Sequence, residues 1–280
     1  REPRGVDRRQ RQMCVSDSAY RIRGVEVDAA APLLQALAAG AVDTGIAGDG
    51  PFLFAWGGGL PLRAAYVIPP RGGGHTTAVV VADGSTIRSP TELSGKRIAT
   101  GRGSIGHLLL LRLIETGAIP SPAPQVVFLQ PAQAKAALDT GRVDAWSTWE
   151  PYVSLETVGH HGHVVIDATG LLPNNSFFVA NDFALSHKQR LLKDFYRREG
   201  GAYGWAQAHQ EQYAHILAQQ TGLPEKVALS VAQQMTASLT PVTEAVMKAE
   251  KTTLELYRQA GLITTSHPLS NAFDESVVAP

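Results

Sequence analysis

The sequence predicts an α/β protein made of two lobes that face each other across a ligand cleft, with a helical C-terminal part. Short apolar runs typical of strands alternate with helical patterns from residue 32 to residue 148, which predicts parallel sheets covered by helices. A repeat supports two similar lobes: Ala36–Asp43 and Ala137–Asp144 share a helix end, a glycine turn and the entry to a strand. A generic turn between helix and strand would produce the same letters. At 280 residues the chain has room for about two domains of ~100–200 residues each.

The individual elements follow from apolar periodicity and from the Gly and Pro residues that separate them. In chain order we expect helix 32–39, strand 44–47, helix 51–56, strand 64–68, strand 77–81, helix 90–94, strand 97–100, helix 105–115, strand 125–129, helix 132–139, strand 145–148, strand 164–166 and an extended run 176–180. Four helices then follow, at 188–199, 202–220, 224–236 and 243–260. Prolines such as Pro61, Pro69 and Pro120 fall between these elements, where a missing N–H costs least.

The composition excludes several classes of protein. With 44% hydrophobic residues, 18% charged residues and a net charge of zero, the chain is globular and does not bind nucleic acid by bulk charge. Cys14 is the single cysteine, so neither an intramolecular disulfide nor a cysteine-based metal site is expected. Apolar runs such as Leu108–Leu111 are far shorter than the ~20 residues of a membrane helix. Residues 1–12 are polar and Arg-rich, with no visible signal peptide. We therefore expect a soluble protein, and a monomer.

A glycine-rich loop is the first candidate site. Gly101–His107 fits G-x-G-x-x-G between a predicted strand and a predicted helix, and such a loop points unbonded amides at an anion. A dinucleotide site would need an acidic residue ~20 positions further on, yet the next strand ends at Gln130 and Pro131. The alternative is a tight turn in which Ser104 only caps the helix.

A second helix start lies at the equivalent place in the first half. Gly48 and Asp49 close a predicted strand, and Pro51 suits the first turn of the following helix. Two helix N-termini could thus face one ligand across the cleft. A capped helix start with no further role explains these residues equally well.

Aromatic residues follow the second copy of the repeat. In the strand 145–148, Trp146 points to one face, and Trp149 follows on the other. Aromatic side chains at a strand end wall ligand pockets, but they also form ordinary core. Glu150 would repel an anion, so it suits a hinge salt bridge or a ligand that also carries an amine. Asn175 could meet a ligand or satisfy a turn.

Catalytic and metal-binding motifs have little support. His160, His161 and His163 have the donors for a metal, but in a loop beside glycine they are more typical of a solvated turn. No nucleophile elbow, zinc-protease helix or phosphate-binding loop with its lysine is found. We therefore expect no catalytic residue, no cofactor and no metal, and a protein that is not an enzyme.

Several runs together resemble one family. Leu33–Asp49, Gly103 and Ser104 with His107, Val143–Tyr152, and Thr169–Leu171 with Asn175–Phe177, in this order, resemble the solute-binding proteins of aliphatic sulfonate ABC importers. Nitrate and taurine binders are near relatives. The resemblance covers roughly residues 25–265.

The resemblance implies a type II periplasmic-binding-protein-like fold in which residues 1–84 and 174–280 form lobe 1 and residues 85–173 form lobe 2. It implies a periplasmic protein that binds an alkanesulfonate or related small anion in the cleft and delivers it to an ABC transporter permease. Carried over by position, the ligand-binding residues are Gly48, Asp49, Gly103, Ser104, His107, Trp146, Trp149, Glu150 and Asn175.

The N-terminal segment departs from the family pattern. The family begins with a strand and a helix, but residues 1–24 hold seven arginines and three acids without strand-like alternation, and only Val25–Val27 resembles the second strand. We expect the first strand–helix unit to be missing or replaced, which would destabilise lobe 1. The alternatives to an importer component are a sulfinate desulfinase-like enzyme on the same fold, with Cys14 as nucleophile, or a nitrate-, taurine- or precursor-binding protein.

Overall fold

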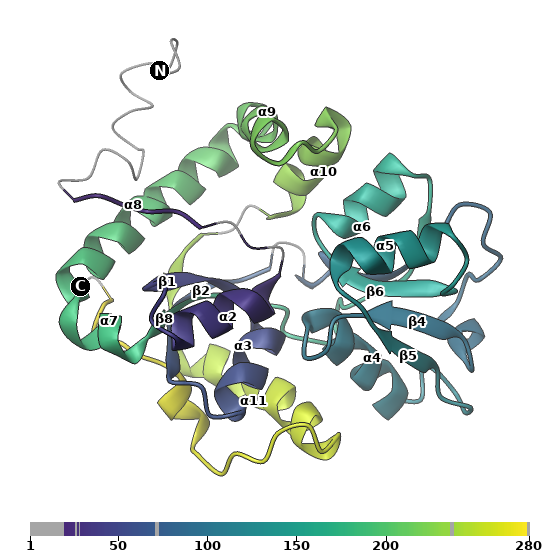
Figure 1. The fold of residues 1–280 in the computed structure, drawn as a ribbon, viewed down its shortest axis with the longest axis horizontal. Coiled ribbons are helices and arrows are strands. Elements are labelled where there is room, and N and C mark those ends of the chain that lie inside the picture. The colour runs from purple at the N-terminus through teal and green to yellow at the C-terminus, as the bar shows by residue number, and fades with distance from the viewer. Residues whose placement is uncertain (1–19, 26, 28, 71–72, 236–237, 279–280) are drawn as a thin grey trace.

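A computed structural model describes residues 20–25, 27, 29–70, 73–235 and 238–278 (Figure 1). Cys14 and most of the atypical segment 1–24 lie outside the described residues. Val25 and Val27 belong to no strand and are exposed, so the second strand expected there is not formed by these two residues. No helix in the described part of the chain is both long and apolar enough to span a membrane.

The first sheet contains β1 (Thr44–Gly48), β2 (Leu62–Ile68), β8 (Ser176–Asn181) and β9 (Thr240–Pro241), in the order β1-β8-β2-β9. Its paired strands are all antiparallel, contrary to the parallel sheet expected. The physical reason is that the chain returns from the other lobe at β8, which inserts between β1 and β2, so hydrogen-bonded residues such as Thr44 and Val179 are 135 positions apart. Local alternation of strand and helix cannot reveal such a return.

Helices cover this sheet. The helices α2 (Ala30–Ala38) and α3 (Asp49–Gly57) bury Leu34, Leu37 and Phe52 against its strands, and α11 (Glu244–Gln259) packs on α3. In the described residues β1 is an edge strand, and Ile46 at its centre is 41% exposed.

The second sheet contains β3 (Thr77–Val81), β4 (Arg97–Thr100), β5 (Gln125–Phe128), β6 (Ala145–Trp149) and β7 (His163–Asp167), in the order β5-β4-β6-β3-β7. Strands β5, β4 and β6 are parallel, as expected, whereas β3 is antiparallel to β6 and β7. Because β3 pairs with β6 and β7, residues 77–81 belong to the second sheet, whereas lobe 1 was expected to extend to residue 84.

The second sheet is covered on both faces, by α4 (Ile105–Glu115) and α5 (Pro131–Asp139), which Figure 1 shows on opposite sides of it. Neighbouring residues of β4 point to opposite faces: Ile98 belongs to the same buried cluster as Leu108 of α4, and Ala99 to the same buried cluster as Ala134 of α5. A short 3₁₀ turn, Pro90–Leu93, replaces the helix predicted at 90–94. The helices predicted at 105–115 and 132–139 are confirmed.

The C-terminal part is mostly helical, as expected. It contains α7 (Asp182–His187), α8 (Gln189–Ala208), α9 (Gln210–Thr221) and α10 (Glu225–Met235), followed by α11 and the 3₁₀ turn Leu269–Ala272. The break predicted between 199 and 202 is wrong, because α8 continues through Gly200 and Gly201 and ends at Ala208. Burial of Leu192 and Tyr196 along one face of α8 outweighs the low helix propensity of the two glycines.

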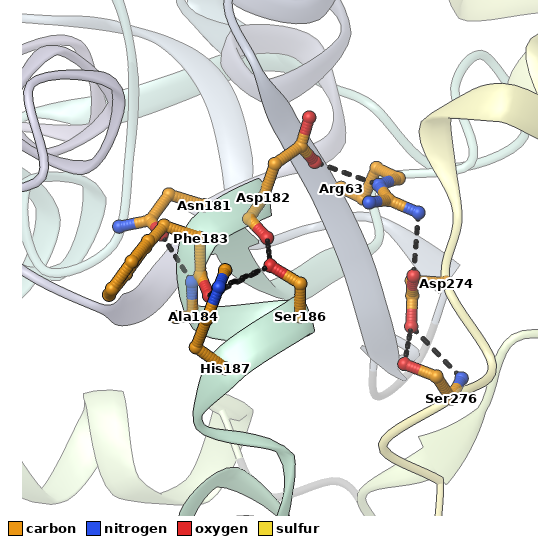
Figure 2. Close-up of polar contacts among 9 residues, drawn as sticks. All are labelled: Arg63, Asn181, Asp182, Phe183, Ala184, Ser186, His187, Asp274 and Ser276. Atoms are coloured by element: carbon orange, nitrogen blue, oxygen red, sulfur yellow. Dashed lines mark hydrogen bonds and ion pairs between the residues drawn. The ribbon is translucent and has the colours of Figure 1, made fainter.

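Helix α10 reaches back to the second lobe. It packs on α6 (Tyr152–Ser154) and on the π-helical turn Leu155–Gly159, and the hydroxyls of Ser154 and Ser230 are 2.9 Å apart. The end of the described chain contacts the first lobe. Arg63 of β2 forms ion pairs with Asp182 of α7 at 2.8 Å and with Asp274 near the C-terminus at 2.7 Å (Figure 2).

Candidate functional site

The two segments of chain that connect the lobes lie side by side and are joined by hydrogen bonds. Asn174, on the return crossing, has a left-handed backbone with a φ of 56°, which Asn tolerates better than most residues. Its side chain accepts a hydrogen bond from Thr77 Oγ1 at 2.7 Å and donates one to Thr76 Oγ1 at 2.8 Å. The amide of Glu150 donates to the carbonyl oxygen of Thr76 at 2.9 Å. These bonds form a compact base beneath the space between the lobes.

A cavity of about 460 Å³ lies above this base and is lined from both lobes. Its volume falls in the range of sites for small organic molecules. The polar lining comes mostly from loops and helix starts and includes Gln35, Thr76, Thr77, Arg102, Ser104, Gln130, Glu150, Asn174, Asn175, Ser176 and Gln234. The apolar lining is concentrated in the first lobe and includes Leu34, Ile46, Phe54, Ala55 and Leu60.

The start of α4 faces this cavity. Ser104 is its N-cap, and Ser104 Oγ accepts a hydrogen bond from the amide of His107 at 3.1 Å. The amides of Ile105 and Gly106 lie in the first turn, where no preceding helical carbonyl can accept from them. Gly103 has a φ of 69°, and a Cβ there would lie 2.6 Å from the ring of Phe54, so the close approach of the two lobes requires glycine. The arrangement suits an anion.

His107 lies behind this loop and does not line the cavity. Its Nδ1 accepts a hydrogen bond from the amide of Gly103 at 3.2 Å. Burial, and secondarily the positive charge of Arg102, lower the pKa of His107 to about 4. The imidazole is therefore neutral at neutral pH, so it supports the loop without adding positive charge to it.

The start of α3 is already filled by its own side chain. Asp49 is fully buried; its Oδ1 accepts from the amide of Gly50 at 2.6 Å and its Oδ2 from the amide of Asn175 at 3.0 Å. Burial raises the pKa of Asp49 to about 7. Pro51 has no N–H to offer. Gly48 and Pro51 line the cavity but Asp49 does not, so of the two helix N-termini expected to face one ligand, α4 alone is available.

The two tryptophans have different surroundings. Trp146 is 1% exposed and packs against Tyr152 with ring centroids 5.3 Å apart, in the core between the second sheet and α5. Trp149 lines the cavity, and its ring reaches the glycine-rich loop at Gly101. The strand alternation predicted from the sequence explains the difference.

Glu150 lines the cavity but is held by its own lobe. Its carboxylate accepts from the hydroxyl and the amide of Ser154 at 2.9 and 3.2 Å. Burial raises its pKa. No ion pair of Glu150 is found among the described residues, so the salt bridge expected at the hinge is not formed there.

Of the nine predicted residues, the structure brings six together in the cavity wall: Gly48, Gly103, Ser104, Trp149, Glu150 and Asn175. It places Asp49, His107 and Trp146 behind the wall. Sequence reasoning missed Arg102, which is the sole basic residue in the described lining and lies 4.9 Å from the ring centroid of Phe128. Its position inside the glycine-rich loop was the available signal. Gln234 and Tyr203 also line the cavity, and no local pattern marks them.

The histidine-rich loop is not assembled as a metal site. His163 Nε2 lies 2.7 Å from the carbonyl oxygen of Ile87, on the surface of the second lobe. The described residues contain no group of three or more His, Cys, Asp or Glu side chains placed to hold a metal ion.

Residues 20–213 match the family described as NMT1/THI5 like. A relative from Escherichia coli (strain K12), named for binding aliphatic sulfonates, is 30% identical over 244 residues, which is 87% of this chain and 76% of the relative. The alkanesulfonate-binding protein SsuA from Xanthomonas axonopodis pv. citri, solved bound to MOPS, is 30% identical with a TM-score of 0.79, covering 89% of this chain and 86% of that one. The desulfurization enzyme DSZB shares the fold alone, at 16% identity and a TM-score of 0.58 over 82% of each chain.

Proposed function

Because the chain belongs to the NMT1/THI5-like family, we propose that it is the periplasmic solute-binding component of an ABC importer. In this role it binds an aliphatic sulfonate between its lobes, as a monomer, and delivers it to the membrane permease. The names of its sulfonate-binding relatives support the ligand class, and the two-lobed fold supports the binding role.

The observation that carries the proposal is the start of α4 inside an organic-sized cavity. A sulfonate group carries a permanent negative charge spread over three oxygens. The first-turn amide of Ile105, the hydroxyl of Ser104 and the guanidinium of Arg102 supply donors from one lobe, and Asn175 supplies a side chain at the crossing. With Asp49 occupying the start of α3, the head group belongs to the second lobe.

The apolar lining then selects the rest of the ligand. Phe54, Leu34 and Ile46 of the first lobe, and Trp149 of the second, present hydrocarbon to the cavity. A bare nitrate or sulfate ion leaves this surface unused, whereas an alkyl tail covers it. Each methylene that is buried contributes about 0.8 kcal/mol, or roughly a fourfold gain in affinity, until the cavity is full.

Calorimetric titration of the purified protein tests the proposal with ligands matched in pairs. Alkanesulfonates of increasing chain length are compared with carboxylates of the same chains, with taurine, and with nitrate and sulfate. We expect affinity for sulfonates to rise with chain length and to exceed that for the matched carboxylates. A ligand at 100 times its Kd also stabilises the fold by about 2.7 kcal/mol, which a thermal melt detects as a shift of several degrees.

Two results would overturn parts of this assignment. Binding of sulfate or nitrate as tight as that of every alkanesulfonate would remove the role of the apolar wall. A folded protein that binds none of the sulfonates would remove the ligand class altogether.

The proposal includes the absence of catalysis. The sulfonate-binding relatives reported above are named as binding proteins, and the enzyme DSZB shares only the fold. Incubation with an aryl sulfinate and an assay for sulfite checks this directly. Release of sulfite that disappears in Cys14→Ala would establish the desulfinase alternative, because an unrelated contaminant would not respond to that substitution.

A further inference from the structure

One face of α11 lies beneath the candidate site and is fully buried. Glu250, Thr253, Leu254 and Tyr257 are each no more than 1% exposed. Glu250 and Tyr257 are seven residues apart, which is two helical turns, so both side chains project from the same face. This face packs against α3 of the first lobe and α4 of the second.

Tyr257 connects this helix to the glycine-rich loop of the other lobe. Its hydroxyl donates to the carbonyl oxygen of Gly103 at 3.1 Å and lies 3.3 Å from the carbonyl oxygen of Ser104. Its ring packs edge-on against Phe54, with centroids 5.4 Å apart, and Phe54 is the side chain that Gly103 approaches most closely. The contact therefore spans the two lobes at the position where α4 begins.

The loop needs such a constraint because of its composition. Gly103 has a left-handed backbone, and glycine changes φ and ψ at little energetic cost, so the peptide groups on either side of it are free to rotate unless they are bonded. Both of its own polar groups are bonded: the amide donates to His107 Nδ1 and the carbonyl accepts from Tyr257. The orientation of the α4 start depends on these two bonds.

The same helix face also supports the cavity wall at the crossing. Glu250 Oε1 accepts a hydrogen bond from Asn175 Nδ2 at 2.7 Å, and Asn175 lines the cavity. Thus α11 holds one wall residue through Glu250 and the anion-facing loop through Tyr257, although neither side chain lines the cavity.

We propose that Tyr257 is a positioning residue for ligand binding: its bond to Gly103 keeps the start of α4 directed at the ligand and holds the two lobes together in their facing arrangement. This inference rests on the proposed function of the same site. It adds a residue from the C-terminal helix that has no contact with the ligand.

The chain offers a matched control for Tyr257→Phe. Tyr196 is 1% exposed, and its hydroxyl lies 2.7 Å from Thr44 Oγ1 within the first lobe, away from the cavity. Tyr196→Phe therefore removes a buried, hydrogen-bonded tyrosine hydroxyl, as Tyr257→Phe does at the carbonyl oxygens of Gly103 and Ser104, but leaves the glycine-rich loop untouched. Both variants should melt at similarly reduced temperatures.

The test has two readouts. Calorimetry with hexanesulfonate, well below the melting temperature, should show a Kd about five- to tenfold weaker for Tyr257→Phe and unchanged within twofold for Tyr196→Phe. Hydrogen exchange of the ligand-free proteins, followed by mass spectrometry, should show at least tenfold faster exchange in the peptide covering residues 101–107 for Tyr257→Phe alone.

The two readouts separate this inference from the proposed function. If the unaltered protein binds no sulfonate, the proposed function fails, while the exchange of residues 101–107 still decides the role of Tyr257. The inference is wrong if that exchange is the same in Tyr257→Phe and the unaltered protein. It is also wrong if both tyrosine variants lose affinity equally, because the effect would then follow from stability alone.

Discussion

The contact between Gly106 and β6 leads to the sharpest prediction, on Gly106→Ala. A Cβ at this position would lie 2.3 Å from the carbonyl oxygen of Ser147 and 2.9 Å from Thr100 Oγ1. The oxygen belongs to the backbone of a central strand, and Ser147 Oγ also donates to the carbonyl of Gly106 at 2.7 Å. The first turn of α4 therefore rests directly on β6 and has no room for a methyl group.

The size of the effect follows from this geometry. An ordinary van der Waals contact of 3.4 Å requires the helix start to move by about 1.1 Å. Overpacking of this kind costs about 1–3 kcal/mol of stability. The same movement lengthens a ligand hydrogen bond from ~2.9 Å to ~4 Å, beyond bonding distance, and a bond to a charged group is worth ~1.5–3 kcal/mol. We expect sulfonate affinity to fall at least tenfold.

Urea unfolding and calorimetric titration measure the two effects separately. The control is Gly201→Ala in the middle of α8, where no atom lies within 4 Å of the added Cβ, so the same substitution should stabilise the protein by about 0.5–1 kcal/mol and leave affinity unchanged. Gly106→Ala with unaltered stability and affinity would refute the reasoning, since the contact with Ser147 would then not limit the position of α4.

Three further predictions concern charge, capping and pH. Arg102→Gln should weaken sulfonate binding about three- to tenfold and make the affinity less sensitive to salt. The control is Arg142→Gln, at an exposed turn of the second lobe, which should change neither the affinity nor its salt dependence. Titrations at two ionic strengths measure both. Ser104→Ala should cost about 1 kcal/mol in urea unfolding, through loss of the cap on α4, and should also weaken the ligand. Burial raises the pKa of Asp49 to about 7 and that of Glu250 well above its usual range, so the folded protein holds protons that the unfolded chain releases. The stability that these two carboxyls contribute should therefore be complete below about pH 4 and be lost as pH rises to 7 and beyond. Glu250→Gln should flatten this decline, and an unchanged slope in urea unfolding from pH 4 to 8 would contradict it.

Much of the secondary structure is determined by local sequence. The helix 105–115 and its cap at Ser104 follow from a polar residue with a free hydroxyl directly before an apolar run, and the structure forms both. The strands at 44–47, 97–100 and 145–148 follow from short apolar runs bounded by turn residues, and each is present within one residue of its expected bounds. Strand alternation also separates Trp146 from Trp149. These features depend on residues close together in the chain, so the sequence predicts them without knowledge of the fold.

The family resemblance predicted more than the apolar periodicity did, namely the two lobes and candidate residues for the cavity wall. It could not separate residues that line the cavity from those that support it. Asp49 lies one residue from Gly48 and His107 three residues from Ser104, yet both are buried behind the cavity wall. Their hydrogen bonds to the amides of Asn175 and Gly103 hold the side chains there.

Only the tertiary structure decided which distant segments meet at the site. Strand β8 returns from the second lobe to pair with β1 and β2, Gln234 reaches the cavity from α10, and Tyr257 bonds a loop more than 150 residues earlier in the chain. Such contacts arise when two lobes bury apolar surface against each other, and no local sequence pattern predicts which distant residues will then be in contact. The sequence by itself determined the elements and the chemistry available in each loop; the packing of α3, α4 and α11 decided which of that chemistry faces a ligand.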